Sequence, residues 1–213
     1  MFTASESAIV WGIDTADRLF SSSFRDDVFG LFRAWHNERA LNDSSPWNRF
    51  TLIMAYATDA HLAIRNLHQS PFDVGCRVTL GDFTVEQVSD LNFRHGSPLK
   101  DPDEVRRLCR LVGGHPYLVR RALLEIKKRG LSLDDLDVEA EREDGLFADH
   151  LNRLLTALLI DSNLCDSLRK LLLGEAVPSE NLTRLCCAGV LVSGSPAHPR
   201  CALYDRFLRT HLL

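Results

Sequence analysis

Short, continuously apolar segments separated by a helical stretch are the feature that most constrains how this chain folds. The first covers residues 9–13 and is followed by Asp14, and the second covers residues 50–57 and is followed by Thr58. A third, shorter one covers residues 76–80, and residues from about 21 to 39 carry apolar side chains at helical spacing. Strands that are apolar throughout and alternate with helices are typical of a parallel sheet covered on both faces. The sequence therefore predicts an α/β core with its chemistry at the strand ends, beside Asp14 and Thr58.

From Gly81 onward, the pattern changes to a series of helices with consistent start and stop residues. Each predicted helix buries one apolar face, and its ends carry capping residues or a proline in the first turn. The boundary residues are, in chain order, Thr84 with Gln87, Asp101-Pro102, Gly113-Gly114, Pro116 and Gly130. The chain is therefore expected to be mostly helical.

The last third predicts three helices followed by a hairpin. Apolar faces recur within residues 147–158, 164–172 and 182–186, and two short strands are expected at residues 190–192 and 200–203 around a Ser-Gly-Ser-Pro turn. This order is typical of a winged helix.

Charge and hydropathy exclude several classes of protein. The 213 residues carry a formal net charge of −4, so there is no global positive field to attract nucleic acid or anionic lipid. No apolar segment approaches the roughly 18 residues that cross a bilayer, and no basic leader begins the chain. We therefore expect a cytoplasmic protein that does not enter membranes.

Motifs for metal binding and hydrolysis are missing from the sequence. The six cysteines form no C-x-x-C pair and are interpreted as reduced core residues, and the eight histidines show no metal spacing. Neither H-E-x-x-H nor G-x-S-x-G occurs. A hydrolase triad stays open at this stage, because its members need only be neighbours in space.

Several segments resemble one family of nucleotide-binding proteins. Residues 9–20, with Asp14 ending the apolar run, resemble the Walker B motif of AAA-like, STAND-type P-loop ATPases. The run Gly-Gly-His-Pro-Tyr-Leu-Val at residues 113–119 resembles the bacterial AAA-like ATPase-domain family. Further similar segments lie at residues 69–75, 81–84, 149–151 and 200–204, so the resemblance extends over essentially the whole chain.

The resemblance implies roles for five residues and a cofactor, ATP or ADP with Mg²⁺. Asp14 matches the carboxylate that holds the magnesium ion, usually through water, and Thr58 matches the residue that senses the terminal phosphate. Gly114, His115 and Pro116 match a lid motif near the base and sugar of the nucleotide. Without the family, the same residues are interpreted as a cap at Asp14, a loop at Thr58, and a helix end followed by a proline start.

Two departures from the family weaken the prediction of catalysis. Thr15 occupies the position where the family usually has a glutamate that polarises the attacking water, and threonine is no base at neutral pH. These 213 residues also contain no G-x-x-x-x-G-K-[ST] loop to hold the β- and γ-phosphates. The chain is thus similar to the carboxy-terminal portion of the family, and by itself it is expected to bind nucleotide weakly or not at all and not to hydrolyse it.

The resemblance also implies a domain organisation. Residues 1–82 are expected to be a truncated P-loop NTPase core, residues 83–145 a helical lid, and residues 146–213 a winged-helix domain. In related sheets the strand that leads to the phosphate loop lies between the strand before Thr58 and the strand at residues 76–80. Its absence would leave two strands with unsatisfied edges.

Three functions follow as hypotheses. The first is a partial or degenerate ATPase module that acts as a nucleotide-dependent signalling switch in the complete protein. The alternatives are a non-catalytic protein-interaction module and a winged-helix DNA-binding regulator. The expected recognition helix, residues 180–188, offers Arg184 as its only basic side chain, which disfavours nucleic acid as a partner. The expected partner is the missing amino-terminal ATPase portion or another protein, with a second copy of the chain as a further alternative.

Overall fold

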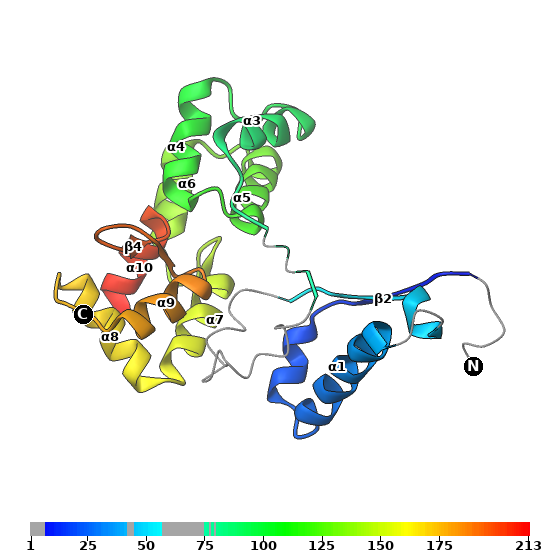
Figure 1. Cartoon of the computed structure of the whole chain (residues 1–213). Helices are drawn as coiled ribbons and strands as arrows, with labels where there is room; N and C mark the ends of the chain where they lie inside the picture. The colour runs from blue at the N-terminus through cyan, green and yellow to red at the C-terminus, as the bar shows by residue number, and fades with distance from the viewer. Residues whose placement is uncertain (1–6, 42–44, 57–74, 77, 79) are drawn as a thin grey trace. The chain divides into compact units, whose positions relative to one another are not determined.

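The chain forms two compact units, residues 1–79 and residues 80–213. The computed structural model describes residues 7–41, 45–56, 75, 76, 78 and 80–213 (Figure 1). The segments predicted as a lid (83–145) and as a winged helix (146–213) both lie in the second unit.

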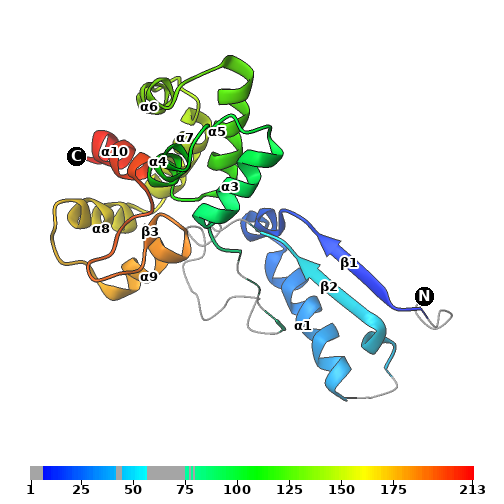
Figure 2. The same ribbon diagram turned by 90° about the horizontal axis from the view of Figure 1, so that it is seen from above.

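The first unit contains a parallel pair of strands and one long helix. Strand β1 (Ile9–Ile13) pairs with β2 (Phe50–Met54), and Ile9 lies opposite Phe50. The 3-10 helix η2 (Ala16–Ser21), helix α1 (Arg25–Leu41) and the 3-10 helix η3 (Pro46–Arg49) connect them. Figure 2 shows α1 running alongside the two strands. The prediction of parallel strands joined by an amphipathic helix is confirmed.

Aromatic side chains join α1 to one face of this sheet. Because paired residues of parallel strands point to the same side, Trp11 and Phe50 share the face that meets α1. The rings of Trp35 and Trp47 stack with centroids 5.0 Å apart, and the ring of Trp35 meets that of Phe50 at 5.5 Å. On the other face, the side chains of Val10 and Ile53 are 64% and 55% exposed.

The strand predicted at residues 76–80 is wrong for the residues that the structure describes. Cys76, Val78 and Leu80 are not in a strand, and the side chains of Val78 and Leu80 are 78% and 87% exposed. An apolar segment becomes a strand through pairing and burial against neighbours. Here the described sheet has β1 and β2 only, so the pattern of this segment finds no adjacent strand.

The second unit begins with four helices whose ends follow the predicted capping residues. They are α3 (Val85–Arg94), α4 (Pro102–Val112), α5 (Pro116–Arg129) and α6 (Leu133–Glu141). The capping box of Thr84 with Gln87 is formed, and Gly113 and Gly130 end α4 and α5 in the left-handed conformation. Helix α6 was not predicted, although Ser132 and Asp135 form a capping box at its start.

Three more helices, a short hairpin and a last helix follow. They are α7 (Ala148–Leu159), α8 (Ser162–Leu172), α9 (Ser179–Cys187), β3 (Leu191–Val192), β4 (His198–Pro199) and α10 (Ala202–Leu212). The predicted order of three helices and an antiparallel hairpin is confirmed.

The second hairpin strand, predicted at residues 200–203, is wrong. Strand β4 lies at residues 198–199, and Cys201 is already the N-cap of α10. The helix forms because Tyr204, Leu208 and Leu212 recur at helical spacing and are buried. Helix α10 packs against α4, α6 and α7, so the end of the chain completes the second unit.

Candidate functional site

The carboxyl ends of β1 and β2 lie side by side, as the sequence predicts. The backbone N–H of Ala55 donates to the carbonyl oxygen of Ile13, and that of Ala16 donates to the carbonyl oxygen of Ala55, both at 2.9 Å. Asp14 therefore stands at the end of the sheet, where it is exposed. Thr58, its predicted neighbour, lies outside the described residues.

A single exposed carboxylate suits water-mediated contact with a hard cation better than direct chelation. One carboxylate oxygen of Asp14 accepts a hydrogen bond from the backbone N–H of Thr15 at 2.8 Å, and the residue is exposed. Mg²⁺ is usually held by one or two carboxylates together with waters and phosphate oxygens. Among the described residues, no group of three or more His, Cys, Asp or Glu side chains could hold a metal without such additional ligands.

Thr15 has a strained backbone. Its φ and ψ are 57° and 41°, the left-handed region that β-branched residues rarely adopt. Strain of this kind costs about 1–2 kcal/mol and is concentrated at functional sites. The residue directly after Asp14 is therefore held in an unusual turn.

The Gly-Gly motif lies in a tight crossing of three chain segments, which we call the glycine junction (Phe83, Gly113, Gly114, Arg200 and Cys201). The backbone N–H of Phe83 donates to the carbonyl oxygen of Gly114 at 2.9 Å. A Cβ on Gly114 would lie 2.3 Å from the carbonyl oxygen of Phe83, and one on Gly113 would lie 2.8 Å from the Cβ of Cys201. The close backbone approach that these glycines permit is thus made by the chain itself.

Arg200 of the glycine junction also forms an ion pair with Asp82. The guanidinium of Arg200 binds the carboxylate of Asp82 through two contacts, one of them 3.0 Å between Nε and Oδ2. The backbone N–H of Arg200 donates to the carbonyl oxygen of Val190 at 3.0 Å. The pair therefore ties the segment before α3 to the hairpin.

His115 and Pro116 begin α5 next to a second histidine. His115 is the N-cap and Pro116 the first helical residue. The ring of His115 meets that of His150 edge-on with centroids 5.1 Å apart, and the ring of Tyr117 stacks on His150 at 5.4 Å. Nε2 of His150 shares a hydrogen bond of 2.7 Å with the hydroxyl of Tyr204. We call these four residues the histidine cluster (His115, Tyr117, His150 and Tyr204).

Both imidazoles of the histidine cluster are held neutral. Burial, with a smaller contribution from the positive charge of Arg200, lowers the pKa of His115 to about 4. Burial also lowers the pKa of His150 to about 4, helped by His115, Arg153 and Arg200. The cluster joins α5 to α7 and α10 and was missed by sequence reasoning, because its residues are separated by up to 89 positions.

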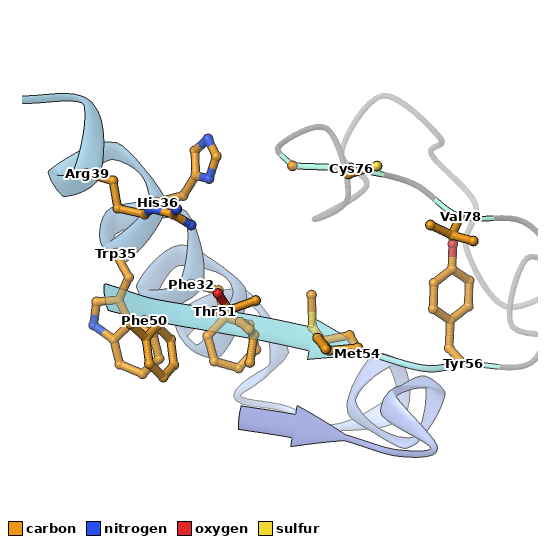
Figure 3. A pocket seen from close by; sticks show the side chains of 13 residues that line it. Phe32, Trp35, His36, Arg39, Phe50, Thr51, Met54, Tyr56, Cys76 and Val78 are labelled. Carbon is orange, nitrogen blue, oxygen red and sulfur yellow. The ribbon is translucent and has the colours of Figure 1, made fainter. Parts of the chain in front are cut away.

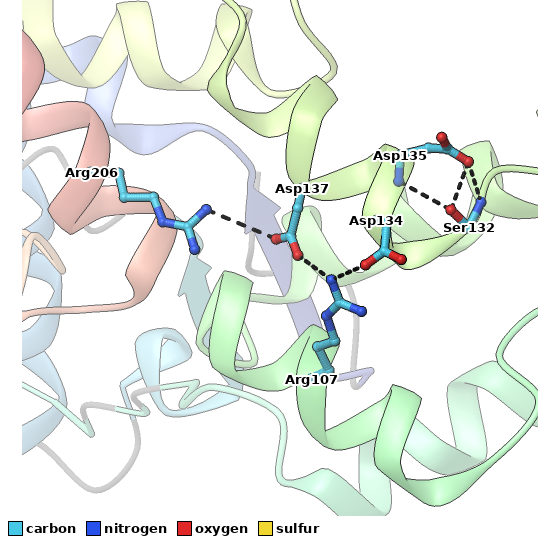
Figure 4. A network of polar contacts seen from close by, with 6 residues as sticks. All are labelled: Arg107, Ser132, Asp134, Asp135, Asp137 and Arg206. Atoms are coloured by element: carbon cyan, nitrogen blue, oxygen red, sulfur yellow. Dashed lines mark hydrogen bonds and ion pairs between the residues drawn. The ribbon is translucent and has the colours of Figure 1, made fainter.

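A polar network joins α10 to α4 and α6 (Figure 4). The guanidinium of Arg107 on α4 contacts Asp134 at 2.5 Å and Asp137 at 2.6 Å, both on α6. Arg206 on α10 approaches the other carboxylate oxygen of Asp137 at 3.9 Å. These ion pairs therefore join α4 and α10 to α6 within the second unit.

The polar residues expected to read DNA are turned inward. The side chain of Arg184 is 8% exposed, and its guanidinium lies 2.8 Å from a carboxylate oxygen of Asp161. The amide of Asn181 donates to the hydroxyl of Ser167 at 2.7 Å. Arg184, the basic side chain of the expected recognition helix, and the neighbouring Asn181 are therefore used within the protein.

The first unit also contains a cavity that sequence reasoning missed. Its volume is about 600 Å³, and it lies between α1, β2 and the residues Gly75, Cys76 and Val78 (Figure 3). The lining is mainly apolar and aromatic, with His36 and Arg39 as its basic members.

Within the part of the chain that the structure describes, no helix is long and apolar enough to cross a membrane.

Comparison with known proteins gives a family match. The sequence model of the AAA-like domain family matches residues 1–210. An uncharacterized WD repeat-containing protein of Synechocystis sp. is 30% identical over 144 residues, which are 65% of this chain and 12% of that protein. The chain therefore spans about an eighth of the curated relative. No solved structure gives a significant match.

Proposed function

The chain belongs to the AAA-like domain family, and from that premise we propose that it is the carboxy-terminal part of a nucleotide-dependent signalling switch of the STAND type. In this proposal the first unit is the remnant of a P-loop NTPase core. The second unit contains the helical lid and a winged-helix segment. The complete switch binds ATP or ADP with Mg²⁺ in the cytoplasm, and this chain alone does not hydrolyse ATP.

The observation that carries the proposal is the position of Asp14. It ends a parallel strand, it is exposed, and the end of the neighbouring strand is hydrogen-bonded to the turn that follows it. Ligands of open α/β sheets bind beyond the carboxyl ends of the strands. Asp14 is thus suited to hold Mg²⁺ through water, and Thr58 to contact the terminal phosphate.

The residue after Asp14 fits the proposal that nucleotide is bound but not hydrolysed. Thr15 cannot accept a proton from water at neutral pH, so no base follows Asp14. A bound nucleotide would then not be hydrolysed on this chain. Its effect on the switch would depend on whether the diphosphate or the triphosphate is bound. Gly114, His115 and Pro116 belong to the second unit, where a ligand contact at this turn would reach α10 through the glycine junction and the histidine cluster.

A non-catalytic interaction module is the second candidate. The side chains of Val10 and Ile53 favour it, because they are exposed among the described residues, whereas a parallel sheet is normally covered on both faces. The DNA-binding alternative has less support, because Arg184 is buried in an ion pair with Asp161. Partners of the native protein are therefore proposed to be protein segments, including a second copy of the chain.

The test begins with the native product that contains these residues. Its mass, and its binding of fluorescent MgATP, should be measured for the parent protein, for Asp14→Ala and for Asp17→Ala, a neighbouring carboxylate in η2 that serves as control. We expect Mg-dependent binding that Asp14→Ala weakens at least tenfold and Asp17→Ala leaves unchanged. MgATP turnover by the isolated 213-residue chain that Asp14→Ala abolishes would contradict the proposal.

A further inference from the structure

Helix α5 has two faces of opposite character. One face carries the buried apolar side chains, and the helix packs against α3, α4 and α6. The exposed side chains lie on the other face, which we call the basic face (Tyr117, Arg120, Arg121, Leu124, Lys127 and Lys128). Because the whole chain carries a net charge of −4, this gathering of cations is a local feature of one helix.

The side chains of the basic face are ordered in three rows along the helix. Residues seven positions apart lie on nearly the same side of an α-helix. Tyr117 and Leu124, which are 45% and 41% exposed, form an apolar row in the middle. A basic row flanks it on each side (Arg120 with Lys127, and Arg121 with Lys128). An apolar row between charged rows is the arrangement by which helices pair in coiled coils.

The cations of the basic face are largely unused within the second unit. Among the described residues, the side chains of Arg120, Lys127 and Lys128 make no hydrogen bond or ion pair. Arg121 approaches Glu125 of the same helix at 3.9 Å. Many other arginines of this unit do have a carboxylate partner (Arg94, Arg106, Arg107, Arg129, Arg184 and Arg200). The basic face therefore retains positive charge that an acidic partner would neutralise.

The surroundings of the basic face favour a helix as its occupant over a nucleic acid or a membrane. The ring of Tyr117 already stacks on His150, so it is not free to stack on a base. Glu125 and Glu139 each lie within ion-pair distance of an arginine of α5, and their charges would repel a continuous phosphate backbone. Leu124 is the only aliphatic side chain of the face, which is little apolar surface for insertion into a bilayer.

We propose that the basic face of α5 binds an acidic amphipathic helix of a partner protein. Apolar side chains of the partner helix pack along the row of Tyr117 and Leu124, and its Asp and Glu side chains pair with the basic rows on both sides. From Tyr117 to Lys128 the face extends about 17 Å, so about three turns of the partner helix cover it. This binding needs no nucleotide at Asp14, so the inference goes beyond the proposed function.

The experiment is a selection of peptides from a random eighteen-residue display library on the full 213-residue chain, without nucleotide. We expect enrichment of peptides with apolar residues at helical spacing and Asp or Glu between them. A selected peptide resynthesised with Lys in place of its acidic residues should bind at least tenfold more weakly, and the selected peptide itself should bind more weakly at high salt. Enrichment of basic peptides, of acidic peptides without helical spacing, or of none would overturn the proposal.

Charge reversal on the chain provides the matched control. The double variant Arg120→Glu/Lys128→Glu should weaken binding of the selected peptide at least tenfold, whereas Lys170→Glu, which reverses an exposed charge on α8, should leave it unchanged. Equal affinity for the parent and the double variant would place the peptide elsewhere and overturn the proposal. Circular dichroism checks that each variant is folded, and the milder Arg120→Gln, with an expected loss of about threefold, replaces a double variant that does not fold.

The same variants identify other occupants. Tighter binding of a DNA duplex or of phosphatidylserine vesicles than of the selected peptide, lost in the double variant, would overturn the proposal in favour of nucleic acid or a membrane. Self-association of the chain that the double variant abolishes would identify a second copy and would also overturn it. Since the selection contains no nucleotide, peptide binding together with failed MgATP binding would contradict the proposed function alone.

Discussion

The two units of this chain use apolar residues in different ways. In the second unit the side chains of Leu108, Leu118, Leu158 and Leu208 are fully buried. In the first unit, residues of comparable size in the strands, such as Val10 and Ile53, are more than half exposed. Burying one such side chain contributes about 1.5–3 kcal/mol. The described strands of the first unit therefore gain less from apolar burial than the helices of the second unit do.

The largest expected effect comes from filling the glycine junction. Gly114→Ala places a Cβ against the carbonyl oxygen of Phe83 and at a φ of +72°, so it should lower the free energy of unfolding of the second unit by about 2–5 kcal/mol. Gly130→Ala is the control, because its φ is +67° and none of the described atoms lies within 4 Å of the added Cβ. It should lower the free energy of unfolding by only about 1–2 kcal/mol. Urea unfolding followed by circular dichroism measures both, and equal losses would contradict the crowding at Gly114.

Acid is expected to destabilise the second unit through the histidine cluster. The pKa of His115 and of His150 is about 4 in the folded chain against 6.5 for a free imidazole, so the unfolded chain binds more protons between these values. Stability is therefore fully present above pH 6.5 and is lost as the pH falls toward 4. From pH 7 to 4.5 we expect a loss of about 2–3 kcal/mol for the coupled pair.

The control for the acid effect is His150→Gln, which removes one titrating ring and keeps a hydrogen-bond partner for Tyr204. Its urea midpoint should depend less on pH in this range than that of the parent. The same pH dependence in both proteins would show that other groups cause the loss.

Relief of backbone strain should stabilise the first unit. Thr15→Gly removes the Cβ from a residue at φ 57°, and the gain is expected to be about 1 kcal/mol. Thr51→Gly, in regular strand β2, is the control and should lose about 0.5–1 kcal/mol. Hydrogen exchange of β1 and β2 amides measures both changes within the first unit, and slower exchange is expected for Thr15→Gly. Faster exchange would mean that another contact of Thr15 outweighs the strain.

The smallest expected effect concerns the exposed network of the second unit. Arg107→Gln breaks the contacts to Asp134 and Asp137, and it should lower Tm by less than Gly130→Ala does. Because the side chains of Arg107 and Asp134 are 41% and 82% exposed, the decrease should shrink at high salt. Arg106→Gln, which loses a contact within α4 alone, is the control. A salt-independent loss would indicate a packing role for the Arg107 side chain.

Local features of the fold could be predicted from the sequence where one short segment decides the outcome. The capping box of Thr84 and Gln87 and the left-handed ends at Gly113 and Gly130 depend on residues within a few positions. The strand predicted at residues 76–80 is wrong at the described residues Cys76, Val78 and Leu80, because a strand needs a neighbour, which no local pattern reveals. Residues 200–203 do not form the predicted strand, because α10 begins within them. The burial of α10 against α4 and α6 is a property of the whole unit.

The candidate site could be predicted only in part. Asp14 at the end of β1 followed from the apolar run before it. The crossing of Phe83 and Arg200 at Gly113-Gly114 could not, because it joins segments more than 100 residues apart along the chain. The pairing of Arg184 with Asp161 was also hidden, since helical periodicity does not show which ends of neighbouring helices meet.

The packing of α10 against α4 and α6 has a consequence for the order of folding. Helices α3 to α6 are complete by residue 141, yet the surface that α10 covers stays open until the chain has reached residues 202–212. Contacts between segments so far apart close late and slow folding, because the intervening chain must first be ordered. During synthesis, the apolar surface of the earlier helices that α10 covers therefore stays exposed until α10 has been made.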